Sequence, residues 1–190
     1  DERILSDVIV IDDSEEYADV EKELIFLGPL AFEKKCLKRI LRAAKAYSRP
    51  PSEKEAGFIL LGSIRQIDGT PVFIVEDQVQ LCGMVTPLQV SFDLSDIKKI
   101  IEEAEKDHLT IVGVLHTHPR GDAEPSLHDK ISWLILQSEI GRAVPLLIYS
   151  LNNDKIGMLY IEWQLIDQLI QRLKTRKMSI ERIFQKHDLR

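Results

Sequence analysis

The sequence is poor in cysteine and has no long apolar run, and both absences narrow the class of protein. Only two cysteines occur in 190 residues, Cys36 and Cys82, and no CxxC pair is present. This usage indicates reduced thiols rather than a disulfide framework. No segment approaches the roughly 20 apolar residues of a membrane helix, and Asp1-Glu2-Arg3 shows no secretory signal. We therefore expect a cytoplasmic protein without a membrane partner.

A basic surface is also lacking. The formal net charge is −6, and ten of the 31 acidic residues lie within residues 1–23 beside only two basic residues. The remaining chain carries 23 basic and 21 acidic residues. Its densest basic run, residues 172–177, is explained by a solvated helix face, so we expect no nucleic-acid partner.

The order of apolar and turn residues predicts mixed secondary structure. Helical spacing favours helices at 31–48, 93–106, 126–140 and from 163 to about 174, with more helix after it. Strands are expected at 7–11, 23–28, 55–65, 71–80, 88–93, 110–115, 144–150 and 155–162, with a loop at 81–87. These elements do not alternate as regular βαβ units, so the predicted fold class is α/β of the mixed α+β type, with a mixed sheet flanked by helices.

The segment with the clearest chemistry follows the strand predicted at 110–115. His116 and His118 are two residues apart, so on a strand they point to the same face. Two adjacent imidazoles supply half of a zinc site, and Asp129 at the start of the next predicted helix can supply a third ligand. Pro119 and Gly121 allow the chain to turn back toward that helix.

Simpler interpretations of the same residues stay open. An HxH pair occurs by chance on many surfaces, and Ser126 with Asp129 has the spacing of a capping box. His128, beside Asp129, is expected to be a helix-surface residue rather than a ligand.

Taken together, these residues resemble the JAMM (MPN-plus) zinc metalloprotease family. His116-Thr117-His118, seven residues, then Ser126, two residues and Asp129 match the family signature H-[S/T]-H-x7-S-x-x-D at every fixed position. The resemblance implies Zn²⁺ on His116, His118 and Asp129, and a central mixed sheet similar to that of cytidine deaminases. It covers roughly residues 23–165.

The family also places a catalytic glutamate upstream, in a run similar to E-x-x-G-hydrophobic-x-x-G. Glu55 stands at the corresponding distance before Gly62, although the first glycine, Gly57, comes one place early. Glu53 lies on the same strand face and remains an alternative. The resemblance implies that Glu55 is the general base and that Ser126 binds the oxyanion.

The same resemblance implies a substrate class. Similar enzymes remove ubiquitin or a ubiquitin-like protein after its Gly-Gly tail, and this chain resembles an archaeal homologue of the proteasome-lid deubiquitinase. Residues 78–89 stand where the family keeps an insertion that grips the tail, and the tight turn at 150–156 predicts little linkage selectivity. A proteasome-type assembly or a homodimer is the expected partner arrangement.

Two other functions and a domain division complete the expectations. A JAMM hydrolase that processes a sulfur-carrier protein would use the same residues, and a non-catalytic MPN scaffold subunit would leave the zinc dormant. We expect an acidic extension at 1–22, a catalytic domain at 23–165 and a C-terminal helix and tail at 166–190.

Overall fold

The structure is a computed structural model, and one seven-stranded mixed sheet organises it. It describes residues 24–48, 54–81, 85–86, 89–90 and 94–176. The strands lie in the order β1-β2-β4-β3-β7-β8-β9; β2 pairs parallel with β4 and β7 parallel with β8, and the other neighbours are antiparallel. Their bounds are β1 (Leu24–Leu27), β2 (Leu30–Glu33), β3 (Gly57–Ile67), β4 (Thr70–Leu81), β7 (Thr110–His118), β8 (Leu146–Ser150) and β9 (Lys155–Leu159).

The described helices and a second small sheet surround this sheet. The helices are α1 (Lys34–Ser48), α2 (Leu94–Lys106), α3 (Leu127–Ile140) and α4 (Trp163–Arg176). The small sheet pairs β5 (Val85–Thr86) with β6 (Gln89–Val90).

The mixed α+β fold class predicted from the sequence is confirmed. Among the described residues, no helix combines the length and the apolar character that a membrane span requires.

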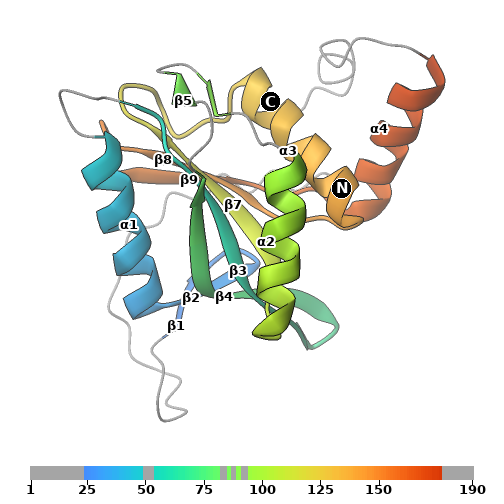
Figure 1. The fold of residues 1–190 in the computed structure, drawn as a ribbon, viewed down its shortest axis with the longest axis horizontal. Coiled ribbons are helices and arrows are strands. Elements are labelled where there is room, and N and C mark those ends of the chain that lie inside the picture. Colours follow the sequence, from blue (N-terminus) through green and yellow to red (C-terminus); the bar gives the residue numbers. More distant parts are fainter. Residues whose placement is uncertain (1–23, 49–53, 82–84, 87–88, 91–93, 177–190) are drawn as a thin grey trace.

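The central sheet is covered on both faces, so it has two cores (Figure 1). Helix α1 covers one face, and the α1-side core includes Ile40 together with Phe58 and Leu115 from the strands. Helices α2, α3 and α4 cover the other face, and the core beneath them includes Trp133 and Ile166. Neighbouring strand residues divide between the two cores because successive side chains point to opposite faces.

Several strand boundaries differ from the sequence prediction by two or three residues, and two regions differ in the type of element. The helix expected from residue 31 begins at Lys34, because Leu30–Glu33 form β2. Residues 30, 31 and 32 are all fully buried between β1 and β4, and that burial outweighs the helical spacing that they share with α1. Of the strand expected at 88–93, the structure describes only Gln89–Val90, which form β6, and Val85–Thr86, expected in a loop, pair with it as β5.

Other expectations lie outside the described residues. These include the strand at 7–11, the acidic extension and the tail after residue 176. Helix α4 crosses the expected domain limit at residue 165, and its Ile166, Leu169 and Ile170 are buried in the same core as α2 and α3. Packing against the chain's own domain therefore accounts for these apolar positions, while the division into three segments stays a prediction.

A β-bulge in β7 decides which core each of its later residues faces. Leu60 pairs with Gly113 but Leu61 pairs with Ile111, so Val112 is an extra residue in the ladder. As a result Ile111 and Val114 both face the α2–α4 side, whereas Val112 and Leu115 face α1. If β7 instead continued its regular alternation from Ile111 without the bulge, the side chains after Gly113 would point to the opposite faces.

The burial of α4 leads to a stability prediction. Ile166→Ala should lower the free energy of unfolding by about 2–5 kcal/mol, because it removes apolar contacts and leaves a cavity in a fully buried position. Urea unfolding measures this change. Gln168→Ala on the exposed face of the same helix is the control and should change stability by less than about 0.5 kcal/mol. Equal effects of the two substitutions would contradict the observed packing of α4.

Candidate metal centre

The last residues of β7 and the residues just before β3 place three side chains on one face of the sheet. His116 and His118 lie on β7, two residues apart, and both follow Val114 on the α2–α4 side. Gly57 is the register partner of His116, so Glu55, two residues before Gly57, returns to the same face. The pairing of β3 with β7 therefore brings together residues that are 61 positions apart in sequence.

The loop from β7 to α3 is fixed by β8 and β9. Ser150 Oγ donates a hydrogen bond to Gly121 O at 2.6 Å, and the backbone O of Asp122 lies 2.8 Å from His118 Nδ1. Gly157 of β9 passes under this loop so closely that a Cβ there would lie 1.8 Å from Ala123 O. These contacts orient the His118 ring and leave its Nε2 for the site.

Helix α3 begins with a reciprocal cap that also holds the candidate carboxylate. Ser126 is the N-cap; its Oγ accepts from Asp129 N at 3.2 Å, and Ser126 N donates to Asp129 Oδ2 at 2.7 Å. Ser126 Oγ also lies 2.6 Å from Asp129 Oδ2. The capping box considered from the sequence is therefore present, and it points Asp129 toward both imidazoles rather than away from them.

Four side chains meet in this centre. His116 Nε2 lies 3.1 Å from Glu55 Oε2, and His116 Nδ1 lies 2.7 Å from Asp129 Oδ1. His118 Nε2 lies 3.3 Å from Asp129 Oδ2. Glu55, His116 and His118 offer ligand atoms that all lie within 4.8 Å of one another. The structure thus gives two imidazoles and two candidate carboxylates, one on each side of His116.

The electrostatics of the centre favour a cation. Burial by itself lowers the pKa of His116, but hydrogen bonds with Asp129 and Glu55 outweigh it and raise this pKa from 6.5 to about 9. Burial raises the pKa of Asp129, but hydrogen bonds with His116 and His118 hold it far below its usual range. Without a metal, protonated imidazole balances the carboxylates; a divalent cation bound by neutral imidazoles can replace that charge.

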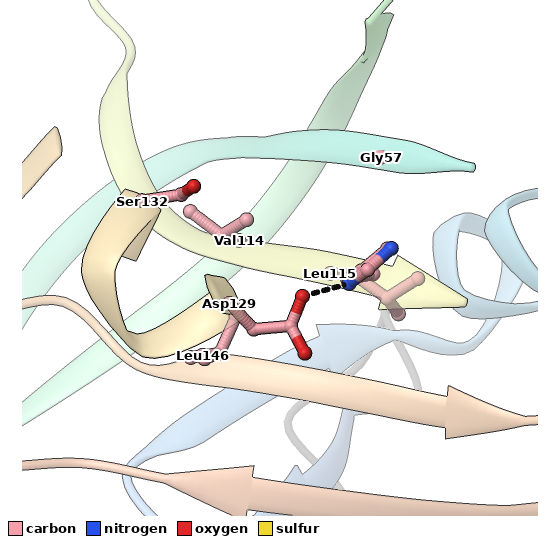
Figure 2. Close-up of a pocket in the computed structure, with 7 residues that line it drawn as sticks. Gly57, Val114, Leu115, Asp129, Ser132 and Leu146 are labelled. Atoms are coloured by element: carbon pink, nitrogen blue, oxygen red, sulfur yellow. Dashed lines mark ion pairs between the residues drawn. The ribbon is translucent and has the colours of Figure 1, made fainter. Parts of the chain in front are cut away.

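A small cavity lies on the α3 side of His116. Figure 2 shows Asp129 reaching from α3 toward β7, and the dashed line marks its ion pair with His116. Ser132, one turn further along α3, also lines the cavity, with Val114 and Leu146 on its apolar side. The lining therefore combines apolar side chains with the His116 ring and the Asp129 carboxylate.

All five site residues predicted from the sequence occur in this one region, although their chemical roles stay predictions. Glu53, the alternative base, lies outside the described residues. The sequence analysis missed Ser150 and Gly157, because nothing in the spacing shows which loop they contact. It also missed Ser132, which the i, i+3 spacing from Asp129 on one helix would have indicated.

A family comparison agrees with this geometry. A family model described as prokaryotic homologs of the JAB domain matches residues 33–155, which is more than half of the chain. The chain belongs to this JAB family. The JAB family includes metalloproteases, and its members commonly bind zinc. No curated protein matches the chain.

Solved structures similar to this JAB chain are distant in sequence. A protein from Desulfitobacterium hafniense is 21% identical, with 69% of this chain and 83% of the other covered and a TM-score of 0.52. A JAB1/MPN domain protein from Archaeoglobus fulgidus is 22% identical, with 68% and 85% covered and a TM-score of 0.35. At these identities, the Desulfitobacterium likeness concerns the fold alone.

The raised pKa of His116 predicts how metal binding depends on pH. Below about pH 9 the metal-free chain holds a proton on His116, and a metal must displace it. Zn²⁺ affinity, measured by competition with a chromophoric chelator, should therefore rise with pH between 6 and 9, by about tenfold per unit for each proton released.

Two variants control this measurement. His116→Ala should abolish tight binding, whereas His108→Asn, which replaces an exposed imidazole in the turn after α2, should leave the pH dependence unchanged. An affinity that does not vary over this range would contradict the raised pKa of His116.

Proposed function

We propose that this JAB protein is a zinc-dependent peptidase that hydrolyses the bond after the C-terminal Gly-Gly of a ubiquitin-like protein. The observation that supports it most is the convergence of His116, His118, Asp129 and Glu55 in one largely buried centre. A scaffold without catalysis has no need for both carboxyl groups beside the same imidazole. The match of the JAB family model supports the reaction class, and the substrate class is our proposal.

The donor set fits zinc. Two imidazoles and a carboxylate are the ligands of open catalytic zinc sites, in which a further position stays free for water or substrate. We assign His116, His118 and Asp129 as the ligands. Zinc held there would supply Lewis acidity toward the scissile carbonyl and toward a water molecule.

Glu55 is the proposed general base. Its side chain is 13% exposed, compared with 6% for Asp129, so Glu55 is the more accessible of the two carboxyl groups. Its Oε2 already lies at hydrogen-bond distance from His116 Nε2, which places it at the edge of the ligand set. From this position Glu55 can accept a proton from the attacking water and pass it to the leaving amine.

Ser126 is the proposed donor to the oxyanion. It is exposed, and its hydroxyl has a hydrogen to donate. When that hydrogen turns to the substrate, Asp129 Oδ2 keeps the hydrogen bond from Ser126 N at 2.7 Å. The cap and the catalytic role are therefore compatible, because each uses a different donor of the same residue.

The proposed substrate tail needs a narrow binding surface beside this centre. Strand β6 contacts α3, the helix that carries Asp129, so the small β5–β6 sheet borders the same helix. An extended Gly-Gly tail can bind beside strands because its small residues fit a narrow channel. We assign this small sheet to tail binding.

The proposed function predicts cleavage of a reporter fused after the Gly-Gly tail of a ubiquitin-like protein. Chelation should abolish cleavage and added Zn²⁺ should restore it. Glu55→Gln should retain one zinc but lose at least about 100-fold in kcat, because an amide cannot accept the proton. Asp129→Asn should lose zinc as well as activity.

Glu55→Gln and Asp129→Asn together distinguish the general base from the zinc ligand. Zinc content comes from elemental analysis and kcat from gel or fluorescence assays of the same preparations. If Glu55→Gln loses zinc while Asp129→Asn keeps it, the ligand and base assignments are exchanged. If the zinc-loaded protein does not cleave any Gly-Gly fusion, the proposed substrate class is wrong.

Ser126 gives a further prediction, because its two roles have different signatures. Ser126→Ala should cost about 1 kcal/mol of stability through the cap and about 100-fold in kcat through the oxyanion. Ser126→Gly loses the same hydroxyl at a smaller capping cost, so it should be nearly as inactive but more stable. Activity that follows thermal stability across both variants would leave Ser126 with only the capping role.

A further inference from the structure

A buried hydroxyl network lies behind the candidate metal centre, on the α1 face of the sheet. Thr117 stands between His116 and His118, so its side chain points away from the centre and is fully buried. Thr117 Oγ1 lies 2.9 Å from Ser48 Oγ, the last residue of α1. Ala56 N donates to Thr117 Oγ1 at 2.7 Å. We call these contacts the Ser48–Thr117–Ala56 network.

The network ends next to the proposed base. Ala56 immediately follows Glu55, and both precede Gly57, the first residue of β3. Thr117 N donates to Ala56 O at 2.9 Å, which extends the ladder by one residue. The amide of Ala56, however, is held by the Thr117 side chain. The backbone beside Glu55 is therefore held from two directions by one residue of β7.

The Ser48–Thr117–Ala56 network is buried among apolar side chains, where hydroxyl groups are costly. Ser48 is 2% exposed, and Ala56 and Thr117 belong to the apolar face that includes Phe58 and Leu115. Apolar residues of similar volume would fill this space without the cost of burying hydroxyl groups. A fully satisfied polar network in such a core fixes geometry more than it adds stability.

We propose that Thr117 is a positioning residue for Glu55, acting through the Ala56 amide with Ser48 as its support. This inference rests on the proposed function, since it assigns the base that Thr117 orients. The two imidazoles are held by the sheet pairing of β7 and do not depend on the hydroxyl. Loss of the hydroxyl should therefore affect the base and spare the metal.

The test compares Thr117→Val with Thr117→Ser in the zinc-loaded full chain. Thr117→Val should lower kcat on the Gly-Gly fusion by about 10- to 100-fold with KM and zinc content unchanged, as expected for a displaced catalytic group. Thr117→Ser keeps the hydroxyl and should restore most of kcat. Thr110→Val is the control: it makes the same change at the start of β7, where the hydroxyl accepts from Arg142 Nη2, and should leave kcat unchanged.

Amide hydrogen exchange gives a readout that does not depend on activity. The Ala56 amide should exchange at least about tenfold faster in Thr117→Val than in the wild type. In Thr117→Ser, which keeps the hydroxyl, it should exchange more slowly than in Thr117→Val. This measurement tests whether Thr117 holds the Ala56 amide, and it does so even if the wild type cleaves no fusion. Absence of cleavage would count against the proposed function alone. Unchanged exchange of Ala56, or loss of zinc in folded Thr117→Val, would overturn the inference.

Ser48→Ala provides a second route if Thr117→Val does not fold. It removes the support but keeps the hydroxyl that holds Ala56, so kcat should fall by less than in Thr117→Val. If both variants fold, their double variant should be no worse than Thr117→Val alone, because both act through one contact. Fully additive losses would show that Ser48 and Thr117 act separately, which contradicts the proposed network.

Discussion

The double pairing of β7 is the constraint on which the rest of the site depends. This strand is antiparallel to β3 on one side and parallel to β8 on the other, and it ends with the two candidate ligands. Pairing with β3 brings Glu55 to His116, and the contacts of β8 with the following loop orient His118. A shift of either pairing by one residue would turn the imidazoles out of the centre.

The bulge at Val112 makes this arrangement possible. It resets the alternation of β7, so that His116 and His118 face α3 while Thr117 faces α1. Gly113 lies beside the extra residue, where a Cβ would approach Leu60 Cδ1 to 3.2 Å. One local irregularity therefore directs the metal-binding chemistry to one face and the buried hydroxyl network to the other.

The sequence predicted the parts of this site that depend on local spacing. The shared face of His116 and His118 follows from the period of a strand, and the placement of Asp129 follows from the helix start at Ser126. Which face the imidazoles occupy could not be predicted, because it depends on a bulge that appears only in the pairing with β3. The predicted start of α1 was wrong for a related reason. Residues 30–33 have helical spacing, but their pairing with the edge of β4 makes them a strand of the sheet.

The charges of the centre are balanced by contacts among its own side chains. A largely buried pair of carboxyl groups is unfavourable unless a cation or hydrogen-bond donors balance it. The His116 ring faces Glu55 with one nitrogen and Asp129 with the other, so its protonated form donates to both. The cap from Ser126 holds Asp129 independently of either imidazole. The chain's own hydrogen bonds thus hold the four side chains of the centre together.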